Sequence, residues 1–251
     1  MEANRISIKI GNFLYHRIFP FYKILYPAFK RRQDAAEIGW IRRLVRSRNN
    51  VLDIGANIGF YTCLLSDLVG ADGQVHAFEP DATNFKHLSA MAGHRSNVTL
   101  VPKAVSDHSR KLLIYTSPKL NVDHRTYEFR NYKQAIAVDG VSIDDYLGNG
   151  RSRIDFIKMD IQGYELNALR GMERTIAANP DMVILSEFWP YGFQQCGTSA
   201  SVVYDYIRSL DLQLWLIERG QLRPVSRKAV RELAEVENVY YNVVLSKQPI
   251  L

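Results

Sequence analysis

Short apolar runs alternate with longer amphipathic stretches from residue 51 to residue 245. The runs are rich in β-branched residues and lie at 51–54, 74–78, 98–105, 154–159, 182–185, 212–217 and 239–245. Most of them are separated by stretches of helical spacing, which include 58–69, 81–92, 163–179 and 199–210. Strands that alternate with helices predict βαβ units and an α/β fold, with a mostly parallel sheet covered by helices on both faces.

The middle of the chain departs from this alternation. Two apolar runs, 111–116 and 135–141, flank a polar loop and have no helical stretch between them. They predict a β-hairpin inserted before the fourth main strand.

The first 50 residues differ from the rest in charge. They hold 11 Lys and Arg against three acids, whereas residues 51–251 hold 21 against 23, so the net charge of +6 originates in the N-terminal segment. Its cations are interleaved with aromatic residues such as Phe19, Tyr26 and Phe29. This mixture is typical of an interfacial segment on anionic lipid, and it also fits a helical cap whose aromatic face packs on the main domain. We favour the cap, and divide the chain into a basic, aromatic helical cap at 1–48 and a main domain at 49–251.

The overall composition is that of an ordinary globular protein. Hydrophobic residues make up 47% of the chain and charged residues 23%, which argues against a disordered or fibrous chain. Two cysteines, Cys63 and Cys196, are too few for a disulfide framework and indicate a reducing cytoplasm. No apolar run is long enough to cross a membrane, and no signal peptide is evident. We therefore expect a cytoplasmic protein, with peripheral membrane contact through residues 1–48 as the alternative.

A glycine-rich turn follows the first main strand and contains Asp53, Gly55, Asn57 and Gly59. Ligands bind beyond the carboxyl ends of strands in open α/β sheets, and glycines let the backbone approach them closely. The spacing is neither GxGxxG nor a Walker motif, and an acid at the strand end repels phosphate and attracts an ammonium. Glu79 ends the second strand at the distance where an acid holds ribose hydroxyls in such folds. An adenosine with a cationic amino-acid tail suits both acids, which predicts S-adenosylmethionine as the cofactor.

Five sequence blocks in the same order resemble the FkbM family of S-adenosylmethionine-dependent methyltransferases. They read VLDIGANIGFYT, VHAFEPD, KAVSD, IDFIKMDIQGYELNALRGM and ILSEFWP. The resemblance implies a class I methyltransferase fold with a seven-stranded, Rossmann-like sheet. It also implies O-methylation of a hydroxyl on a sugar, a glycan or a small natural product. The family's usual fourth-strand block is Asp-Val-Glu-Gly, whereas residues 160–163 read Asp-Ile-Gln-Gly, so Gln162 lacks the charge of the family pattern.

Candidate catalytic carboxylates follow the fourth and fifth main strands. Lys158 and Asp160 share a strand face because side chains alternate, and Asp160 is expected to reach the cofactor and substrate pocket. Asp is also a favoured residue at a helix N-terminus, and both roles are compatible. Glu187 lies near Asp160 if their strands are neighbours. Two such carboxylates can bind Mg²⁺ but form only a partial site, so we favour a metal-free enzyme.

The loop of the inserted hairpin contains Asp123, His124 and Arg125. This Asp-His-Arg stretch resembles one in relatives that share the DIQG and EFWP blocks. An imidazole is a natural acceptor for an alcohol proton near neutral pH, so we expect His124 to be the general base and Asp123 to orient it. If His124 is only a solvated loop residue, Asp160 is the leading base. The guanidinium groups of Arg125 and Arg130 are candidates to bind the acceptor.

Two further groups complete the predicted site. Trp189 and Tyr191 offer flat apolar faces for a sugar ring, and we place them with Arg125 and Glu187 among the substrate-binding residues. Asp107, after the third strand, is a candidate partner of the adenine amino group, although a Ser-Asp pair also fits turn chemistry.

Two other classes of function stay open at this point. An RNA-binding methyltransferase would use the basic N-terminal segment for phosphates. However, residues 51–251 are slightly acidic, and the Asn-Pro-Pro-Tyr block of base methylators is missing. A non-catalytic interaction protein that keeps the fold is the second alternative, although the intact Asp53, Glu79 and Asp160 argue that cofactor binding is retained. We therefore expect a small-molecule or glycan acceptor and not a nucleic acid.

Overall fold

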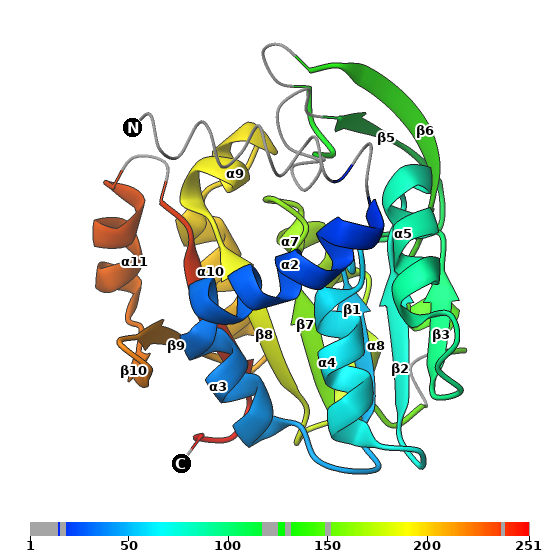
Figure 1. Ribbon diagram of the computed structural model, residues 1–251. Helices are drawn as coiled ribbons and strands as arrows, with labels where there is room; N and C mark the ends of the chain where they lie inside the picture. The colour runs from blue at the N-terminus through cyan, green and yellow to red at the C-terminus, as the bar shows by residue number, and fades with distance from the viewer. Residues whose placement is uncertain are drawn as a thin grey trace.

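A computed structural model describes residue 15 and residues 19–116, 125–128, 132–148, 152–236 and 239–250. An eight-stranded sheet with helices on both faces forms the centre of the molecule (Figure 1). The strand order is β10-β9-β11-β8-β7-β1-β2-β3. The strands are β1 (Asn50–Ile54), β2 (Gln74–Phe78), β3 (Val98–Val101), β7 (Phe156–Met159), β8 (Val183–Phe188), β9 (Gln213–Glu218), β10 (Gln221–Pro224) and β11 (Tyr241–Ser246).

Five neighbouring strands, from β3 to β8, run parallel, and β11 lies antiparallel between β8 and β9. This confirms the predicted α/β fold with a mostly parallel sheet. The sheet has one strand more than predicted, because β10 pairs with β9 in an antiparallel hairpin. Arg219 and Gly220 form its two-residue loop with φ angles of 51° and 77°, the backbone that tight hairpins need. Arg-Gly is a weaker hairpin signal than Asn-Gly or Asp-Gly, so the sequence pattern missed this strand.

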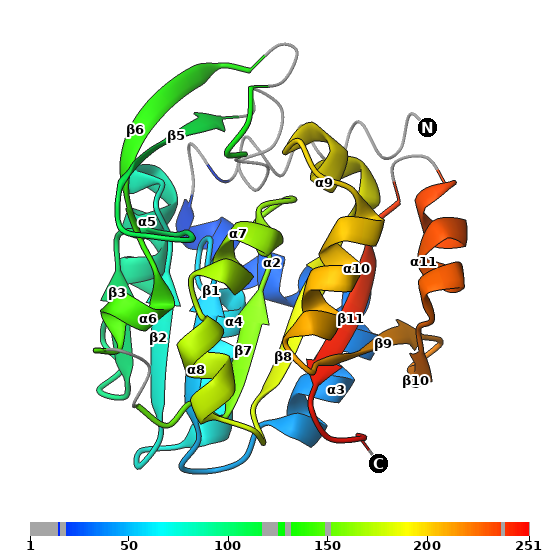
Figure 2. The ribbon, with the colours of Figure 1, turned by 180° about the vertical axis from the view of Figure 1, so that it is seen from behind.

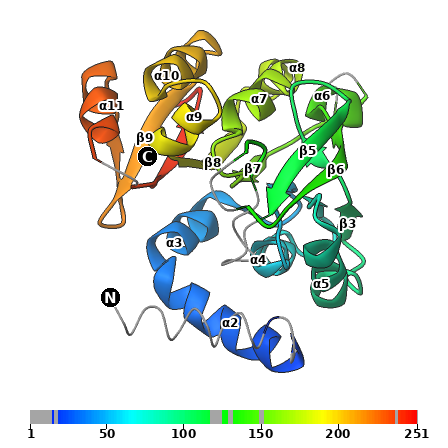
Figure 3. The same ribbon diagram turned by 90° about the horizontal axis from the view of Figure 1, so that it is seen from above.

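Helices cover the two faces of the sheet unequally (Figures 2 and 3). One face carries α2 (Phe19–Gln33), α3 (Ala35–Leu44), α4 (Phe60–Val69) and α5 (Ala82–Ala92), and the other carries α6 (Ile143–Tyr146), α7 (Glu165–Arg170), α8 (Glu173–Ala178), α9 (Pro190–Gln195), α10 (Ala200–Ser209) and α11 (Arg227–Ala234). The central strands contribute to both apolar layers: Leu52 and Ile54 pack under α7, whereas Val51 and Val75 pack under α3 and α4. Strands buried on both faces explain why the apolar runs are nearly continuous.

The stretch 163–179 forms two short helices, α7 and α8, and not the single helix that its spacing predicts. The break falls at Gly171, where a Cβ atom would lie 1.9 Å from the Ser106 carbonyl oxygen. The Gly171 carbonyl accepts a hydrogen bond from the Asp144 amide, and the Asp144 carboxylate accepts from the amides of Arg174 and Thr175 in α8. These tertiary contacts satisfy the backbone groups that a continuous helix would have used.

The predicted hairpin insertion is present as β5 (Lys111–Thr116) and β6 (Gln134–Val141), which pair antiparallel. The run 98–105 is divided between β3 and β4 (Ala104–Val105), and β4 joins β6 in a separate three-stranded sheet. Pro102 lies between the two strands and has no amide hydrogen to continue the ladder. The insertion is thereby anchored beside the carboxyl end of β3.

The described part of the N-terminal segment forms α2 and α3, which pack beside α4. Tyr26 lies edge-on to Phe60 with 6.3 Å between ring centroids, and Ile41 is fully buried in the layer that α4 shares. The Trp40 indole donates a hydrogen bond to the Gly220 carbonyl 3.1 Å away. Within the described ranges, no helix has the length and apolar character needed to cross a bilayer.

Candidate functional site

The glycine-rich turn joins β1 to α4 at the carboxyl edge of the sheet. Gly55 and Gly59 have φ angles of 83° and 94°, in the region that favours glycine. A Cβ atom on Gly55 would lie 2.0 Å from the Asp160 carbonyl oxygen, so the first glycine lets the turn lie directly against the end of β7. Asn57 also has a positive φ angle, of 51°, and its buried side-chain oxygen has no hydrogen-bond partner among the described residues. The turn is therefore narrow and leaves an unsatisfied acceptor at its centre.

Glu79 organises this turn from the end of β2. Its two carboxylate oxygens accept hydrogen bonds of 2.9 Å from the amides of Asn57 and Asp81. Burial raises the pKa of Glu79 to about 7, against the opposing effect of these amides. The Asn84 side chain also lowers the pKa of Glu79 as a hydrogen-bond donor, and the four acceptor positions of a carboxylate still leave capacity for a hydroxyl donor.

Asp53 lies beneath the turn and is completely buried. One oxygen accepts a 2.6 Å hydrogen bond from the Thr62 hydroxyl, and the other has no partner among the described residues. Burial raises the pKa of Asp53, whereas the Lys158 ammonium lowers it. This orphaned oxygen is an acceptor suited to a cationic group that enters the turn.

A cavity of about 70 Å³ lies between the turn and the insertion. Its lining includes Gly55, Asn57, Glu79, Asp160 and Gln162. Small-molecule sites usually measure about 300–1,000 Å³, so a cofactor can enter only if the lining side chains move apart. A second cavity of about 480 Å³ lies between α7 and the loop that leads to α10, lined by Asn167, Arg170, Cys196 and Ser199 among others. The two cavities flank residues 162–164.

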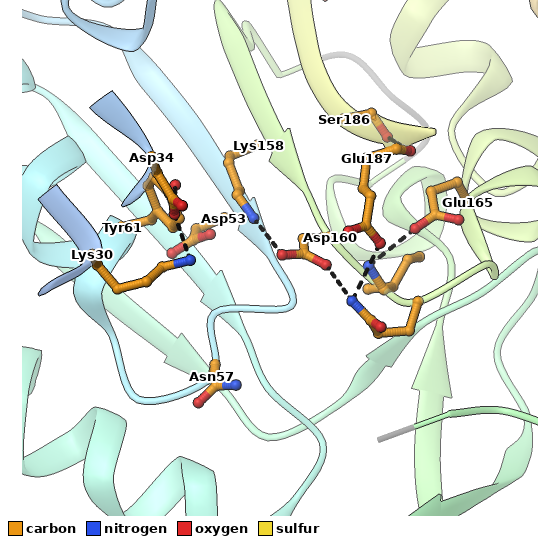
Figure 4. Close-up of polar contacts among 12 residues, drawn as sticks. Lys30, Asp34, Asp53, Asn57, Tyr61, Lys158, Asp160, Glu165, Ser186 and Glu187 are labelled. Atoms are coloured by element: carbon orange, nitrogen blue, oxygen red, sulfur yellow. Dashed lines mark hydrogen bonds and ion pairs between the residues drawn. The ribbon is translucent and has the colours of Figure 1, made fainter. Parts of the chain in front are cut away.

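Lys158, Asp160, Gln162 and Glu187 form a continuous polar cluster at the ends of β7 and β8 (Figure 4). The Lys158 ammonium lies 3.2 Å from one Asp160 oxygen. The Gln162 amide nitrogen donates to the other Asp160 oxygen at 2.9 Å and to a Glu187 oxygen at 3.2 Å. A single neutral amide therefore joins the two carboxylates that the sequence places near each other.

The two carboxylates have opposite pKa shifts. Burial raises the pKa of Asp160, but the Lys158 charge and the Gln162 hydrogen bond outweigh it and lower the pKa below its usual range. Burial and the negative charge of Asp160 raise the pKa of Glu187 well above its usual value. Asp160 therefore favours its ionised form more than an ordinary carboxyl group does, and Glu187 favours its protonated form more.

The N-terminal helices reach this cluster, which sequence reasoning did not foresee. The Tyr61 hydroxyl donates a 2.6 Å hydrogen bond to Asp34, which also pairs with Lys30. Lys158 lies 4.6 Å from the centroid of the Tyr61 ring. Glu37 is 6% exposed, and burial raises its pKa while Lys158 lowers it. Two features of the sequence could have indicated these contacts. Lys158 lies within an apolar strand, and a buried lysine needs a charged partner. Acids are scarce in the basic N-terminal segment, which makes Asp34 and Glu37 stand out.

The predicted aromatic residues are placed differently from each other. Trp189 is only 6% exposed, and the Arg125 guanidinium lies 5.0 Å from the centroid of its ring. Tyr191 is 41% exposed, and its ring centroid lies 5.6 Å from that of Trp189. Tyr191 is therefore the ring that is open to a ligand, whereas Trp189 supports Arg125.

Asp107 does not line the cavity at the glycine turn. One of its oxygens accepts from the Ser106 hydroxyl at 2.8 Å and pairs with Arg110 at 3.1 Å. Burial opposes these contacts, but they and His108 lower the pKa of Asp107. Its proposed contact with adenine stays a prediction.

Three predicted residues, Asp123, His124 and Arg130, lie outside the described residues. Arg125 is described: its backbone exchanges two hydrogen bonds with Tyr115 of β5. The described residues contain no group of three or more His, Cys, Asp or Glu that could hold a metal ion. Between Asp160 and Glu187, the position of a bridging cation is taken by the Gln162 amide.

Comparison with known proteins identifies the family. Residues 53–214 match the methyltransferase FkbM domain. The chain belongs to the FkbM methyltransferase family. This confirms the resemblance of the five sequence blocks, and with the fold it establishes an S-adenosylmethionine-binding methyltransferase domain. No curated protein matches the chain.

Solved structures of three methyltransferases are similar to this chain, and the first of them supports the fold. Precorrin-6y C5,15-methyltransferase from Geobacter metallireducens GS-15 has a TM-score of 0.50 and 12% identity over 86% of this chain and 89% of its own. Methyltransferase FkbM from Methylobacillus flagellatus KT has a TM-score of 0.48 and 20% identity over 79% of this chain. An rRNA methylase from Streptococcus thermophilus has a TM-score of 0.49 and 13% identity over 86% of this chain and 95% of its own. The chain spans 43% of the length of the Methylobacillus protein. These likenesses concern the fold, and the acceptor has to be argued from the site.

Proposed function

We propose that this FkbM-family chain transfers a methyl group from S-adenosylmethionine to a hydroxyl of a sugar, a glycan or a small natural product. The observation that carries the proposal is the Asp160–Gln162–Glu187 cluster, which borders the glycine turn and joins two carboxyl groups with opposite pKa shifts through one amide. Hydroxyl groups are both donors and acceptors, so such a pair can bind both sides of an alcohol.

The residues around the turn fit the cofactor. Glu79 has lone pairs for the ribose hydroxyls, and the buried Asn57 side-chain oxygen lacks a partner among the described residues. Asp53 offers a buried orphaned oxygen for the cationic amino-acid end. When bound, S-adenosylmethionine supplies an activated methyl group on a sulfonium. The lining has to open to admit it, because the cavity there measures only about 70 Å³.

The carboxylate pair aligns the acceptor. Asp160 accepts a hydrogen bond from the hydroxyl and fixes its direction, while Glu187, whose pKa is raised by burial, is held by Gln162 beside it. Lys158 keeps Asp160 ionised, which makes Asp160 a good hydrogen-bond acceptor and a weak base. A stronger base is therefore required for the proton, and His124 takes this role in the proposal. Arg125, the next residue, is fixed to β5 and lies over Trp189 beside the loop that follows β8.

The acceptor side favours a ring with several hydroxyls. Tyr191 presents an exposed ring that suits the apolar face of a sugar. Arg125 adds a guanidinium with several donors next to it. These groups support a glycan or natural-product acceptor over a purely apolar one.

The test begins with calorimetry of the full chain and S-adenosylmethionine, followed by transfer of an isotopically labelled methyl group to a panel of glycosides and polyhydroxylated natural products. We expect a methyl ether, identified by the carbon-13 shift of the new methyl group. Asp160→Asn should bind the cofactor and lose turnover, with Asp145→Asn as an exposed control of the same chemistry. Methylation of RNA bases would support the RNA-binding alternative, and cofactor binding without any transfer would support the non-catalytic alternative. Either result overturns the proposal.

A further inference from the structure

Exposed cations gather on the N-terminal helices without exposed acids beside them in the chain. Between residues 19 and 48, the exposed cationic side chains are Lys23, Arg31, Arg32, Arg42, Arg43, Arg46 and Arg48. The two acids of this stretch face the protein: Asp34 pairs with Lys30, and Glu37 is 6% exposed. Arg48 pairs with Asp72 from the main domain. The outer surface of this stretch is therefore strongly positive.

The outer face of α2 also presents apolar side chains. Leu25 is 58% exposed and Phe29, one turn later, is 62% exposed. Arg32 continues the same face one turn further on. Tyr240 is 52% exposed and lies close to the end of α2: burial raises the pKa of its phenol, the charge of Asp34 adds to this, and Gln33 opposes it. We call Leu25, Phe29, Arg31, Arg32 and Tyr240 the docking face.

We propose that the docking face binds an anionic lipid bilayer, with α2 lying in the plane of the headgroups. Cations that flank exposed Leu, Phe and Tyr side chains are the pattern of a helix that lies in a membrane interface. A nucleic-acid backbone would use the cations but has no need of an exposed Leu25. Charge complementarity and exposed apolar area thus point to the same occupant.

The position of α2 gives the docking a consequence for the enzyme. Figure 3 shows α2 at the periphery of the molecule, on the far side of α4 and α5 from the sheet. Its inner face carries Tyr26 and Lys30. Burial raises the pKa of Tyr26 and the charges of Asp34 and Asp160 add to this, while the Lys30 charge helps Lys158 to lower the pKa of Asp160 against the effect of burial. One helix therefore has the docking face on one side and borders the polar cluster on the other. A bilayer on the docking face is therefore separated from the polar cluster by the thickness of α2.

Vesicle co-sedimentation tests the proposal with the full chain. We expect binding to vesicles of phosphatidylcholine mixed with an equal amount of phosphatidylglycerol, no binding to phosphatidylcholine alone, and weaker binding as salt rises. Each interfacial cation contributes about fivefold in affinity, so the double variant R31E/R32E should bind at least about tenfold more weakly. The variant L25S/F29S should also bind at least about tenfold more weakly, because it removes the inserted side chains.

A matched control reverses two charges elsewhere. K228E/R231E lies on α11, where both residues are exposed, and should bind the mixed vesicles as the unaltered chain does. All variants should keep the melting temperature of the unaltered chain, since the altered side chains are exposed.

Three results would overturn the proposal. Unchanged vesicle binding by R31E/R32E and L25S/F29S would place the lipid contact elsewhere in the chain. Salt-sensitive binding of RNA, lost in R31E/R32E and without vesicle binding, would assign the face to nucleic acid. A dimer in light scattering that L25S/F29S converts to a monomer, without vesicle binding, would assign it to a second copy of the chain. None of these results depends on methyl transfer, so the proposed function is tested separately.

Discussion

The Lys158 ammonium lies 3.2 Å from the Asp160 carboxylate at the end of β7, and the Lys158 side chain is only 4% exposed. Asp53 and Glu37 also act on this one cation, so three carboxylates depend on it. Burial lowers the pKa of Lys158, but the three carboxylates outweigh it and raise the pKa. The ion pair therefore connects Asp53 below the glycine-rich turn, the Asp160–Gln162–Glu187 cluster and the N-terminal helices.

Replacing Lys158 by Met should destabilise the protein by about 3–5 kcal/mol at neutral pH, because it leaves buried carboxylates without a counter-ion.

The folded pKa of Asp160 is depressed, so its ion pair stabilises the fold above the unfolded pKa and this contribution is lost as pH falls through the folded pKa. Lys158→Met should therefore lose less stability on acidification than the unaltered chain. Urea unfolding between neutral and acidic pH measures both effects. Lys228→Met, on an 88% exposed side chain, is the control and should stay within about 0.5 kcal/mol. Equal stability of the two variants would contradict a buried ion pair.

Cofactor affinity should rise with pH through about 7, the pKa of Glu79, because only the ionised carboxylate accepts two ribose hydroxyls fully. Glu79→Gln should bind S-adenosylmethionine about 10- to 100-fold more weakly and lose this pH dependence. Calorimetry at several pH values provides the measurement. If Glu79→Gln and Asp53→Asn both retained the affinity of the unaltered chain, the cofactor would bind elsewhere.

Glu165 gives an independent pH effect on stability. Burial raises its folded pKa from an ordinary 4.5 to about 7, and one oxygen accepts a 3.1 Å hydrogen bond from the Ile161 amide. The folded state then binds more protons than the unfolded state, so this group lowers stability as pH rises from about 4.5 to about 7. Glu165→Gln should flatten the stability profile over that interval. Thermal melts at matched ionic strength measure it, and parallel profiles of variant and parent would refute the assignment.

Chelation by EDTA should leave activity largely intact, because the Gln162 amide takes the position between Asp160 and Glu187. Gln162→Glu would place three carboxyl groups together, and hard oxygen ligands of this kind bind Mg²⁺. We therefore expect Mg²⁺ to stabilise this variant in thermal melts and not the parent, while Gln162→Leu gains no response. Loss of parental activity in EDTA with recovery in Mg²⁺ would instead establish Asp160 and Glu187 as a metal site.

His124→Ala should lower kcat by about 10²–10⁴ and leave the affinity for S-adenosylmethionine unchanged, because a general base acts on the acceptor. Activity of the parent should rise with pH through about 6.5, the ordinary pKa of an imidazole, and the variant should lack this inflection. Asp123→Asn should give a smaller loss if Asp123 only orients the ring. Normal turnover by His124→Ala, with the same inflection, would transfer the role to Asp160.

Gly55 and Gly197 form a matched pair for testing the turn. Both have positive φ angles, but a Cβ atom would lie 2.0 Å from the Asp160 carbonyl at Gly55 and meet nothing within 4 Å at Gly197. Gly197→Ala should cost about 1–2 kcal/mol of stability from backbone strain alone. Gly55→Ala should cost about 2–5 kcal/mol, since overpacking adds to strain, and it should abolish cofactor binding. Equal effects in urea unfolding would mean that the turn is not packed against β7.

The sequence by itself determined the fold and the position of the glycine-rich turn. Apolar runs at strand length separated by helical spacing require buried parallel strands, and the order of Asp53, Gly55, Gly59 and Glu79 places acids and glycines at strand ends. These features are local, because a strand end and the turn that follows it lie within a few residues. The extra strand β10 escaped prediction because an uncommon Arg-Gly turn joins it to β9. The break at Gly171 escaped prediction because a close contact with the Ser106 carbonyl decides it.

Only the tertiary structure decided the partners within the site. Gln162 was notable in the sequence for the charge it lacks, whereas its amide donates to both Asp160 and Glu187. Trp189 and Tyr191 looked equivalent, yet Arg125 covers the first and leaves the second exposed. The N-terminal helices place Asp34 and Glu37 in the surroundings of Lys158, although more than a hundred residues of chain separate them from it. Hydrogen bonds and charge interactions depend on distance in space. Sequence periodicity does not tell which strand ends and helix faces meet when they are more than a hundred residues apart in the chain.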